Sequence, residues 1–536
     1  MGSSEIQIAG ESNKTSEAEE LVRDVFSAAA YGDLVKLRKF VEEDGCAVSG
    51  PDGNGYYPLQ WAALNGYPEI VQYLIEHGAD VNAVDNTLQT ALHWAAVRGS
   101  IPVADLLLQN GARVEAADAN GFRALHVAAQ YGQTAFLDHI IVKYNADFNA
   151  PDNGGRTPLH WAAHKQFPDP MRLLLYRNAS PAKQDNDGCT PLHWAALRGD
   201  VEVCTILIHA GKKEELTVKD KSGFTPAQLA SDKGFRHIAL LLSKAEQALR
   251  QGDRTLAGKL RKIGYAPILF CVVLLSIVLF INSVMNDPDL PPVTAAVGLW
   301  GWTAVSLAFG ALMMLYRLSS HDPGFIALPE KSKHDAEDPL LKIDLKSSPS
   351  WTGNWSQLCP TCKIIRPVRS KHCASCNRCV EQFDHHCPWI SNCVGKRNRW
   401  DFIVFLCMAT ATAVISGIIT VQRIWTIRPV SLHDDGTWIH HVATQHPGFV
   451  CFLTIDSIIL TVVSILSVIQ CYQIARNITT NEMSNAVRYG YLRGPDGKFR
   501  NPYNHGFQKN CTDFFIKGHT SDDEVSWLPL QHAARH

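Results

Sequence analysis

The chain has 536 residues, a formal net charge of −2 and 46% hydrophobic residues. This length exceeds one compact domain, and the near-neutral charge argues against a general nucleic-acid binder. Seven of its fifteen cysteines lie between positions 359 and 393 while the others are scattered, a pattern typical of metal binding in a reducing compartment and not of a disulfide scaffold.

Residues 1–20 are polar and acidic and lack the apolar run of a signal peptide, so we expect a disordered tail. Residues 21–245 then repeat at a period of about 33 residues, with phrases such as TALHWAAVRG from Thr90 and TPLHWAALRG from Thr190. This phrase resembles the ankyrin repeat. We count about seven copies, each expected to form a turn and two short helices, and the array implies a surface that binds a protein partner.

Two residue types recur within the repeats. A tryptophan stands in four of the phrases, as Trp61, Trp94, Trp161 and Trp194. These rings are expected mainly to pack between neighbouring helices, although a regular ladder could also form a peptide-binding surface. The histidine of the phrase has no cysteine at metal-ligand spacing, so we expect it to form structural hydrogen bonds.

A basic linker, 246–264, leads to two uncharged spans at 265–285 and 293–316, each long enough to cross a bilayer. Two more follow at 402–421 and 448–472. Basic residues crowd both terminal flanks and the 317–401 loop, which predicts that these segments, including the 473–536 tail, are cytosolic. Asp456 lies inside the fourth span, where it could mark a functional site, form a structural contact with another helix, or lie near the lumenal interface.

The 359–402 segment of the 317–401 loop holds seven cysteines and three histidines. Two tetrahedral zinc sites require eight ligands, and the spacing supplies them while leaving one cysteine and one histidine over. The predicted ligands are Cys359, Cys362, His372, Cys373, Cys376, Cys379, His386 and Cys393. The remaining pair is Cys387 and His385, with Asp384 next to them, an arrangement of nucleophile, base and orienting carboxylate. Spacing alone would also allow Cys387 as a ligand.

The pattern Cx2C-x9-HC-x2-C-x2-C-x4-DHHC-x5-C resembles the cysteine-rich domain of the DHHC protein S-acyltransferases, or palmitoyltransferases. Two flanking motifs agree, Asp322-Pro323-Gly324 and Thr479-Thr480-Asn481-Glu482. The tail motif NPYNHGFQKN departs from the family at Phe507, where cysteine is common. Ankyrin repeats before four spans match one subgroup of the family, and the chain looks most like the plant tip-growth members.

The resemblance implies a fold and an activity. The fold is mainly α-helical, with an ankyrin solenoid before a four-helix transmembrane bundle that carries a cytosolic zinc-ordered loop. A long-chain acyl-CoA would acylate Cys387, while His385 moves the proton and Asp384 orients the His385 imidazole. The acyl group would then pass to substrate proteins recruited by the repeats. Thr480 would contact Asp384.

The resemblance also implies two structural zinc ions. One would be bound by Cys359, Cys362, His372 and Cys379, and the other by Cys373, Cys376, His386 and Cys393. Arg366 and Arg369 are candidates for the CoA phosphates, although a solvated basic surface would look the same. The chain is expected to contact membrane lipid and no nucleic acid, in the Golgi or alternatively the plasma membrane or vesicles. The alternative function is a non-enzymatic membrane scaffold with a structural zinc loop.

Overall fold

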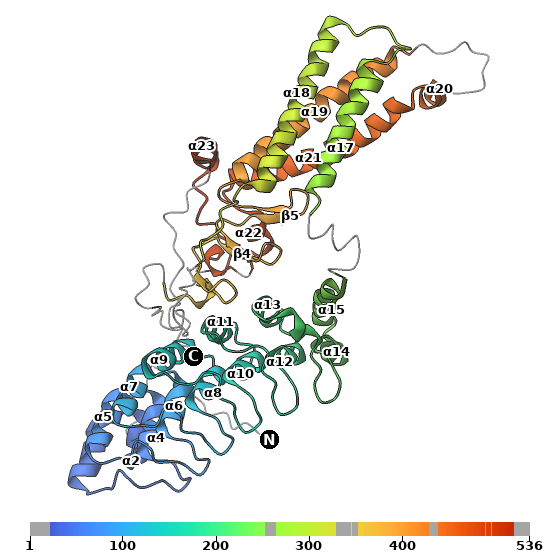
Figure 1. Ribbon diagram of the computed structural model, residues 1–536. Helices are drawn as coiled ribbons and strands as arrows, with labels where there is room; N and C mark the ends of the chain where they lie inside the picture. The colour runs from blue at the N-terminus through green and yellow to red at the C-terminus, as the bar shows by residue number, and fades with distance from the viewer. Residues whose placement is uncertain are drawn as a thin grey trace, which may run out of the picture. The chain divides into compact units, whose positions relative to one another are not determined.

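The computed structural model describes residues 22–251, 264–328, 345, 352–427, 438–487, 489–494 and 496–518. The expected tail 1–20, most of the linker 246–264, part of the 317–401 loop and the end of the C-terminal tail lie outside these residues. The chain divides into two compact units (Figure 1). The first comprises Met1–Arg250, Pro329–Ile365 and Pro529–His536, and the second comprises Gln251–Leu328 and Arg366–Leu528.

Seven helix pairs form the repeat array in residues 22–251. Proline opens many of these helices at the first position, where its missing N–H costs no hydrogen bond, and alanine pairs let the first helices of neighbouring repeats approach closely. The helices are α2 Val25–Tyr31, α3 Leu34–Arg38 with η1 Lys39–Glu43, α4 Pro58–Asn65, α5 Pro68–Glu76, α6 Ala91–Arg98, α7 Ile101–Gln109, α8 Ala124–Gln130, α9 Thr134–Tyr144, α10 Pro158–His164, α11 Pro168–Tyr176, α12 Pro191–Arg198, α13 Val201–Ala210, η2 Lys213–Thr217, α14 Pro226–Asp232 and α15 Arg236–Gln251.

The tryptophans are half-buried against the core of the array. Each indole N–H donates to the aspartate of the turn that opens the same repeat, as Trp194 does to Asp185 Oδ2 at 2.9 Å. The other oxygen of Asp185 accepts the backbone N–H groups of Asp187 and Cys189. The ring therefore packs in the core while its polar atom is satisfied, which supports the packing interpretation of the ladder.

The repeat histidines join one repeat to the next. At the start of α10, His160 Nδ1 accepts the Thr157 N–H at 3.0 Å, and His160 Nε2 lies 3.3 Å from the Cys189 carbonyl of the following repeat. Gln60 takes the same place in an earlier repeat, where it accepts the Tyr57 N–H and donates to the Gln89 carbonyl. The expectation of structural hydrogen bonding is confirmed.

The first unit also contains a short hairpin from the cysteine-rich loop, formed by η6 Trp355–Gln357, β1 Leu358–Cys359 and β2 Ile364–Ile365. Leu358 is fully buried in the core of the array. The Thr361 hydroxyl donates to the His209 carbonyl at 3.0 Å, and the Lys363 ammonium contacts the Leu175 and Tyr176 carbonyls at the end of α11. A cation at a helix C-terminus is favourable, so this hairpin is part of the packed array.

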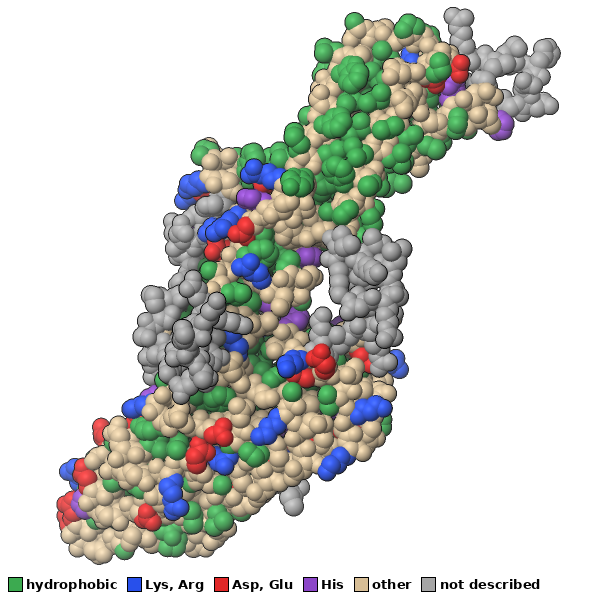
Figure 2. Space-filling model, in the orientation of Figure 1, with side chains coloured by type: hydrophobic (Ala, Val, Ile, Leu, Met, Phe, Trp, Pro, Cys, Tyr) green, Lys and Arg blue, Asp and Glu red, His purple; other side chains and the backbone are tan. Residues whose placement is uncertain are grey.

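The second unit is built on four helical segments that are long and apolar enough to cross a membrane. They are α17 Ala266–Leu279 continuing as η3 Phe280–Met285, α18 Ala295–Ser320, α19 Arg399–Trp425 and α21 Pro447–Ala475. Figure 2 shows hydrophobic side chains gathered along the outer surface of these helices. The expected fold class, an ankyrin solenoid followed by a helical membrane bundle and a cysteine-rich loop, is confirmed.

Polar side chains within the bundle are paired between helices. Ser416 on α19 donates to Asp456 on α21 at 3.1 Å, which is the structural contact that the sequence left open for this carboxylate. At the far ends of the helices, Arg423 donates to the Val284 carbonyl at 3.1 Å. Because an unpaired polar group in an apolar environment is costly, such pairs fix how the helices pack.

Small elements lie between and after these helices. Two antiparallel hairpins, β3 with β4 and β5 with β6, carry the rest of the cysteine-rich segment. The bounds are β3 Lys371–Cys373, β4 Arg378–Val380, β5 His385–Cys387, β6 Asn392–Val394, α20 Trp438–Gln445, α22 Thr480–Ser484, η7 Gly490–Leu492 and α23 Phe507–Lys517.

Candidate active site

Each Cys-x-x-Cys pair forms a tight knuckle. The Cys362 N–H points at the Cys359 sulfur at 3.3 Å, and the Cys376 N–H at the Cys373 sulfur at 3.5 Å. The residue after each pair has a positive φ, 57° at Lys363 and 51° at Asn377. This left-handed residue turns the chain back into the second strand of its hairpin, so both sulfurs project to one side.

The cysteines and histidines gather in two groups of four, and within each group all ligand atoms lie within 4.8 Å of one another. One group is Cys359, Cys362, His372 and Cys379, and the other is Cys373, Cys376, His386 and Cys393. Three sulfurs and one imidazole nitrogen in so small a space fit a closed tetrahedral zinc site. The groups match the predicted ligand sets, and Cys387 belongs to neither.

Strand β5 brings three further groups together directly beside His386. His385 Nδ1 lies 2.6 Å from Asp384 Oδ2, and Cys387 follows two residues after His385 on the same strand. The pKa values of His385 and Cys387 are shifted by each other, and the backbone at Trp389 and Ile390 also lowers the pKa of Cys387. The arrangement is that of a nucleophile, a base and an orienting carboxylate.

The electrostatics favour a thiolate and an imidazolium. Burial is the largest single influence on the pKa of Cys387 and raises it, but His385 and the backbone at Ile390 and Trp389 together outweigh burial, so the pKa is lowered. Burial alone lowers the pKa of His385, but Asp384 and Cys387 raise it to about 9. A thiolate is the nucleophilic form of cysteine, so the pair is prepared to attack an electrophilic carbonyl.

Asp384 is fully buried and held from several sides. Thr480 donates its N–H to Oδ1 and its hydroxyl to Oδ2, both at 2.8 Å, as the resemblance implies. Gln470 on α21 donates to Oδ2 at 3.3 Å. The Arg399 guanidinium lies 3.7 Å from Oδ1. Sequence reasoning did not find Gln470 or Arg399, although a glutamine near the end of an apolar helix is a signal for a functional contact.

The hairpin that carries Cys387 is fixed to the bundle. The Tyr265 N–H at the start of α17 donates to the Pro388 carbonyl at 3.0 Å, and Asn392 donates to the Leu318 carbonyl at the end of α18 at 2.9 Å. Cys387 itself packs against an apolar cluster contributed by the hairpin and three helices. The buried members are Leu315, Leu318, Ile390, Val394, Phe402, Leu406 and Val463.

The two arginines predicted to bind CoA phosphates differ in their surroundings. Arg366 is half-buried. Arg369 is fully buried and makes two hydrogen bonds of 2.8 Å to the Glu482 carboxylate, with its guanidinium 4.2 Å from the centre of the Tyr503 ring. A guanidinium enclosed in this way is not presented to a ligand, which argues against the phosphate assignment for Arg369.

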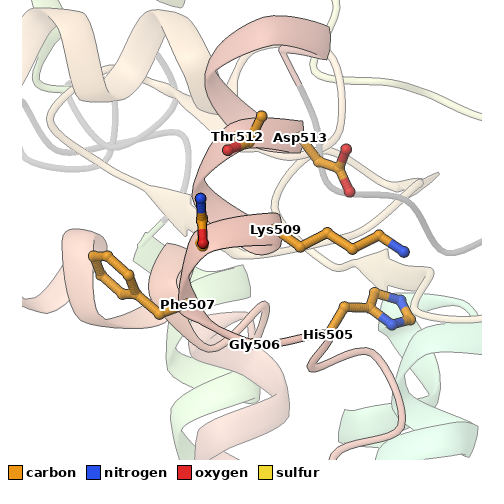
Figure 3. A pocket seen from close by; sticks show the side chains of 7 residues that line it. His505, Gly506, Phe507, Lys509, Thr512 and Asp513 are labelled. Carbon is orange, nitrogen blue, oxygen red and sulfur yellow. The ribbon is translucent and has the colours of Figure 1, made fainter.

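A shallow recess lies at the start of α23, lined by residues from His505 to Asp513. Figure 3 shows Lys509 and His505 directed to one side of the recess and Phe507 to the other. All of its lining residues come from one short stretch, and none belongs to the cysteine and histidine groups. The recess is therefore separate from the candidate active site at β5.

Comparisons with known proteins agree with this geometry. Residues 353–487 match the DHHC palmitoyltransferase model, and 25–118, 113–185 and 169–252 match ankyrin repeats. The chain is 56% identical to "Probable protein S-acyltransferase 23" of Arabidopsis thaliana, covering 98% of this chain and 99% of that protein.

Other relatives match over a smaller part of the chain. Palmitoyltransferase ZDHHC17 of Danio rerio is 37% identical over 36% of this chain and 31% of that protein. Palmitoyltransferase ZDHHC17 of Homo sapiens is 33% identical over 40% of this chain and 35% of that protein. The human ASB11 ankyrin repeat domain is 28% identical, with a TM-score of 0.38, covering 41% of this chain and 97% of that one. The chain belongs to the DHHC palmitoyltransferase family, as an ankyrin-repeat, multi-pass membrane protein S-acyltransferase.

Proposed function

We propose that Cys387 accepts a long-chain acyl group, palmitoyl above all, from acyl-CoA and passes it to cysteines of substrate proteins. The observation that carries this proposal is the pairing of His385 with the buried Asp384 at 2.6 Å, beside a Cys387 whose pKa His385 lowers. The Cys387 thiolate attacks the thioester carbonyl, the carbon–sulfur bond to CoA breaks, and the CoA thiolate takes the proton from His385. His385 then deprotonates the incoming protein thiol, which attacks the acyl-Cys387 thioester. The carbon–sulfur bond to Cys387 breaks, and the Cys387 thiolate leaves beside the protonated His385.

The surroundings of Cys387 favour a lipid-like substrate. Its sulfur borders the apolar cluster at the ends of the helices, so an acyl chain attached to it can extend into apolar surroundings. Each methylene buried in this way contributes about 0.8 kcal/mol. Arg366 remains our candidate for the CoA phosphates, whereas we assign Arg369 to the buried pair with Glu482.

The two Cys/His groups would bind zinc structurally, because all four ligand positions of each are filled by protein. They would hold the hairpins that position Asp384, His385 and Cys387. We propose that the repeat array recruits the substrate proteins. We also propose that the cysteine-rich loop and both termini face the cytosol, as the distribution of basic residues indicates, and that the enzyme works in the Golgi.

The test is Cys387→Ser in the full-length protein, incubated with labelled palmitoyl-CoA. Cys511→Ser, half-buried in α23, is the matched control. We expect Cys387→Ser to keep its zinc and its melting temperature while losing the label, and the control to be labelled like the wild type. Retained label in Cys387→Ser would refute the assignment of the nucleophile, and a wild type that takes up no label would favour the scaffold alternative.

The metal assignment has its own test, Cys373→Ala, read by metal analysis. We expect this variant to bind one zinc ion fewer per chain and to melt at a lower temperature, because a structural zinc site contributes directly to folding. An unchanged zinc content would show that the ligand set is wrong, whatever the activity.

A further inference from the structure

The first residue of α19, Arg399, is a buried charge next to the candidate catalytic group. Its side chain is 4% exposed, and its Nη2 lies 3.7 Å from Asp384 Oδ1 while donating to the Ile478 carbonyl at 3.1 Å. The Asp384 side chain is 0% exposed. Removing two charges from water is expensive unless each has a partner of opposite sign, so the position of Arg399 requires an explanation.

Two arginines and two carboxylates share this buried region, and hydrogen bonding sorts them into pairs. Both oxygens of Glu482 accept from Arg369, so Glu482 already has its countercharge. Arg399 also feels Arg369 and Glu482 electrostatically, but its strongest opposing charge is Asp384. Arg399 is therefore the countercharge of Asp384.

The two oxygens of Asp384 have different partners. Oδ1 accepts the Thr480 N–H and faces Arg399, whereas Oδ2 faces His385 and also accepts from the Thr480 hydroxyl and from Gln470. A carboxylate fixed through one oxygen can rotate little about its last bond, so Oδ2 stays directed at the imidazole. Supporting contacts of this kind hold a catalytic group in its productive geometry.

The backbone at Arg399 is fixed as well. The side chain of the preceding residue, Asn398, accepts the Gly395 N–H at 2.9 Å and donates to the Cys393 carbonyl at 2.8 Å. These bonds tie the start of α19 to strand β6, which pairs with β5 through His385 and Val394. Arg399 is thus placed by the same hairpin that carries Cys387.

We infer that Arg399 is a positioning residue for acyl transfer, which supplies the countercharge that holds Asp384 toward His385. This inference rests on the proposed roles of Cys387, His385 and Asp384. Its predicted effect falls on the chemical step and not on substrate binding, because the Arg399 side chain is buried beside Asp384 and would act through it.

The test compares Arg399→Gln, Arg399→Lys and the control Arg397→Gln in the full-length protein. Arg397 lies two residues away, with a side chain that is 57% exposed and an ion pair to Asp322. We expect the rate of acyl-enzyme formation at saturating palmitoyl-CoA to fall at least tenfold in Arg399→Gln, with KM within twofold of the wild type. Arg399→Lys should recover most of the rate, and Arg397→Gln should keep it.

An unchanged rate in Arg399→Gln would overturn the inference, as would a raised KM at an unchanged maximal rate or no recovery by lysine. In each of these cases, loss of label in Cys387→Ser would show that the nucleophile assignment still holds. Retained label in Cys387→Ser would instead remove the assignment on which the inference rests.

Arg399→Gln also leaves a buried carboxylate without its countercharge, so the melting temperature provides a second measurement. We expect Asp384→Asn and Arg399→Gln each to melt below the wild type. The fall in melting temperature of the double variant should be at most half the sum of the two single falls, because neither charge is then left without its partner. A double variant whose loss equals the sum of the single losses would show that the two side chains are not coupled.

Discussion

The repeat array should lose stability in mild acid through two of its histidines. Burial lowers the pKa of His126 and of His160 to about 4, from an ordinary value of 6.5. In the unfolded chain both would take up a proton near pH 6.5, whereas the folded array resists until about pH 4. Acidification therefore favours the unfolded state, and the stability present at neutral pH is lost progressively as the pH falls from 6.5 to 4.

The size of the effect follows from these values. At pH 5 each histidine costs about 2 kcal/mol relative to pH 7.5, so that the two together cost about 4 kcal/mol. For a unit of this size that corresponds to a fall of roughly 8–16 °C in melting temperature. The physical cause is local: a proton on Nδ1 of His160 removes the acceptor of the Thr157 N–H.

The chain supplies its own matched control. Gln60 makes the same two hydrogen bonds as a repeat histidine and does not titrate in this range. The double variant His126→Gln/His160→Gln should therefore melt near the wild type at pH 7.5 and above it at pH 5, measured by calorimetry of the full-length protein in nanodiscs. Zinc release in acid affects both proteins equally, so only their difference is used. Equal acid shifts in the two proteins would refute the reasoning.

Two other contacts lead to predictions. Arg369→Met should destabilise the second unit by about 3–5 kcal/mol, because it leaves Glu482 buried and unpaired; adding Glu482→Gln should restore much of the melting temperature. A raised KM for acyl-CoA with unchanged melting would instead return Arg369 to the phosphate role. Leu358→Ala should destabilise the first unit by about 2–5 kcal/mol, measured by thermal melting. The control Leu240→Ala, at a side chain that is 54% exposed, should change the melting temperature little. Equal effects of the two substitutions would contradict the packing of the hairpin against the array.

Features that depend on short spacings could be predicted from the sequence. The repeat period, the four apolar spans and the eight ligands follow from local patterns, because knuckles and helices bring together residues that are close in the chain. The division of the ligands into two sets of four came from the family resemblance, since the two sets interleave along the chain. Thr480 was identified through a family motif. Arg369 was misleading because its partner, Glu482, lies 113 residues away, and no local pattern distinguishes a buried arginine from one that faces solvent.

Arg399 and Gln470 were missed for a related reason. Each lies in an apolar helix whose composition indicates a membrane span, and their relevance depends on where the end of that helix meets strand β5. The contact of Lys363 with the end of α11, 187 residues away, is another long-range contact that spacing does not reveal. Tertiary contacts of this range determine which polar residues support the site.

The position of Cys387 reconciles two requirements that oppose each other. A thiolate needs polar or positive neighbours, and His385 together with the backbone at Trp389 and Ile390 lowers the pKa of Cys387. A bound acyl chain needs apolar neighbours, and the Cys387 side chain packs against them at the ends of the helices. The two environments can meet at one sulfur only if the hairpin is attached firmly to the bundle, as the bonds from Tyr265 and Asn392 attach it. Loosening either bond should therefore slow acyl transfer even though neither residue takes part in the chemistry.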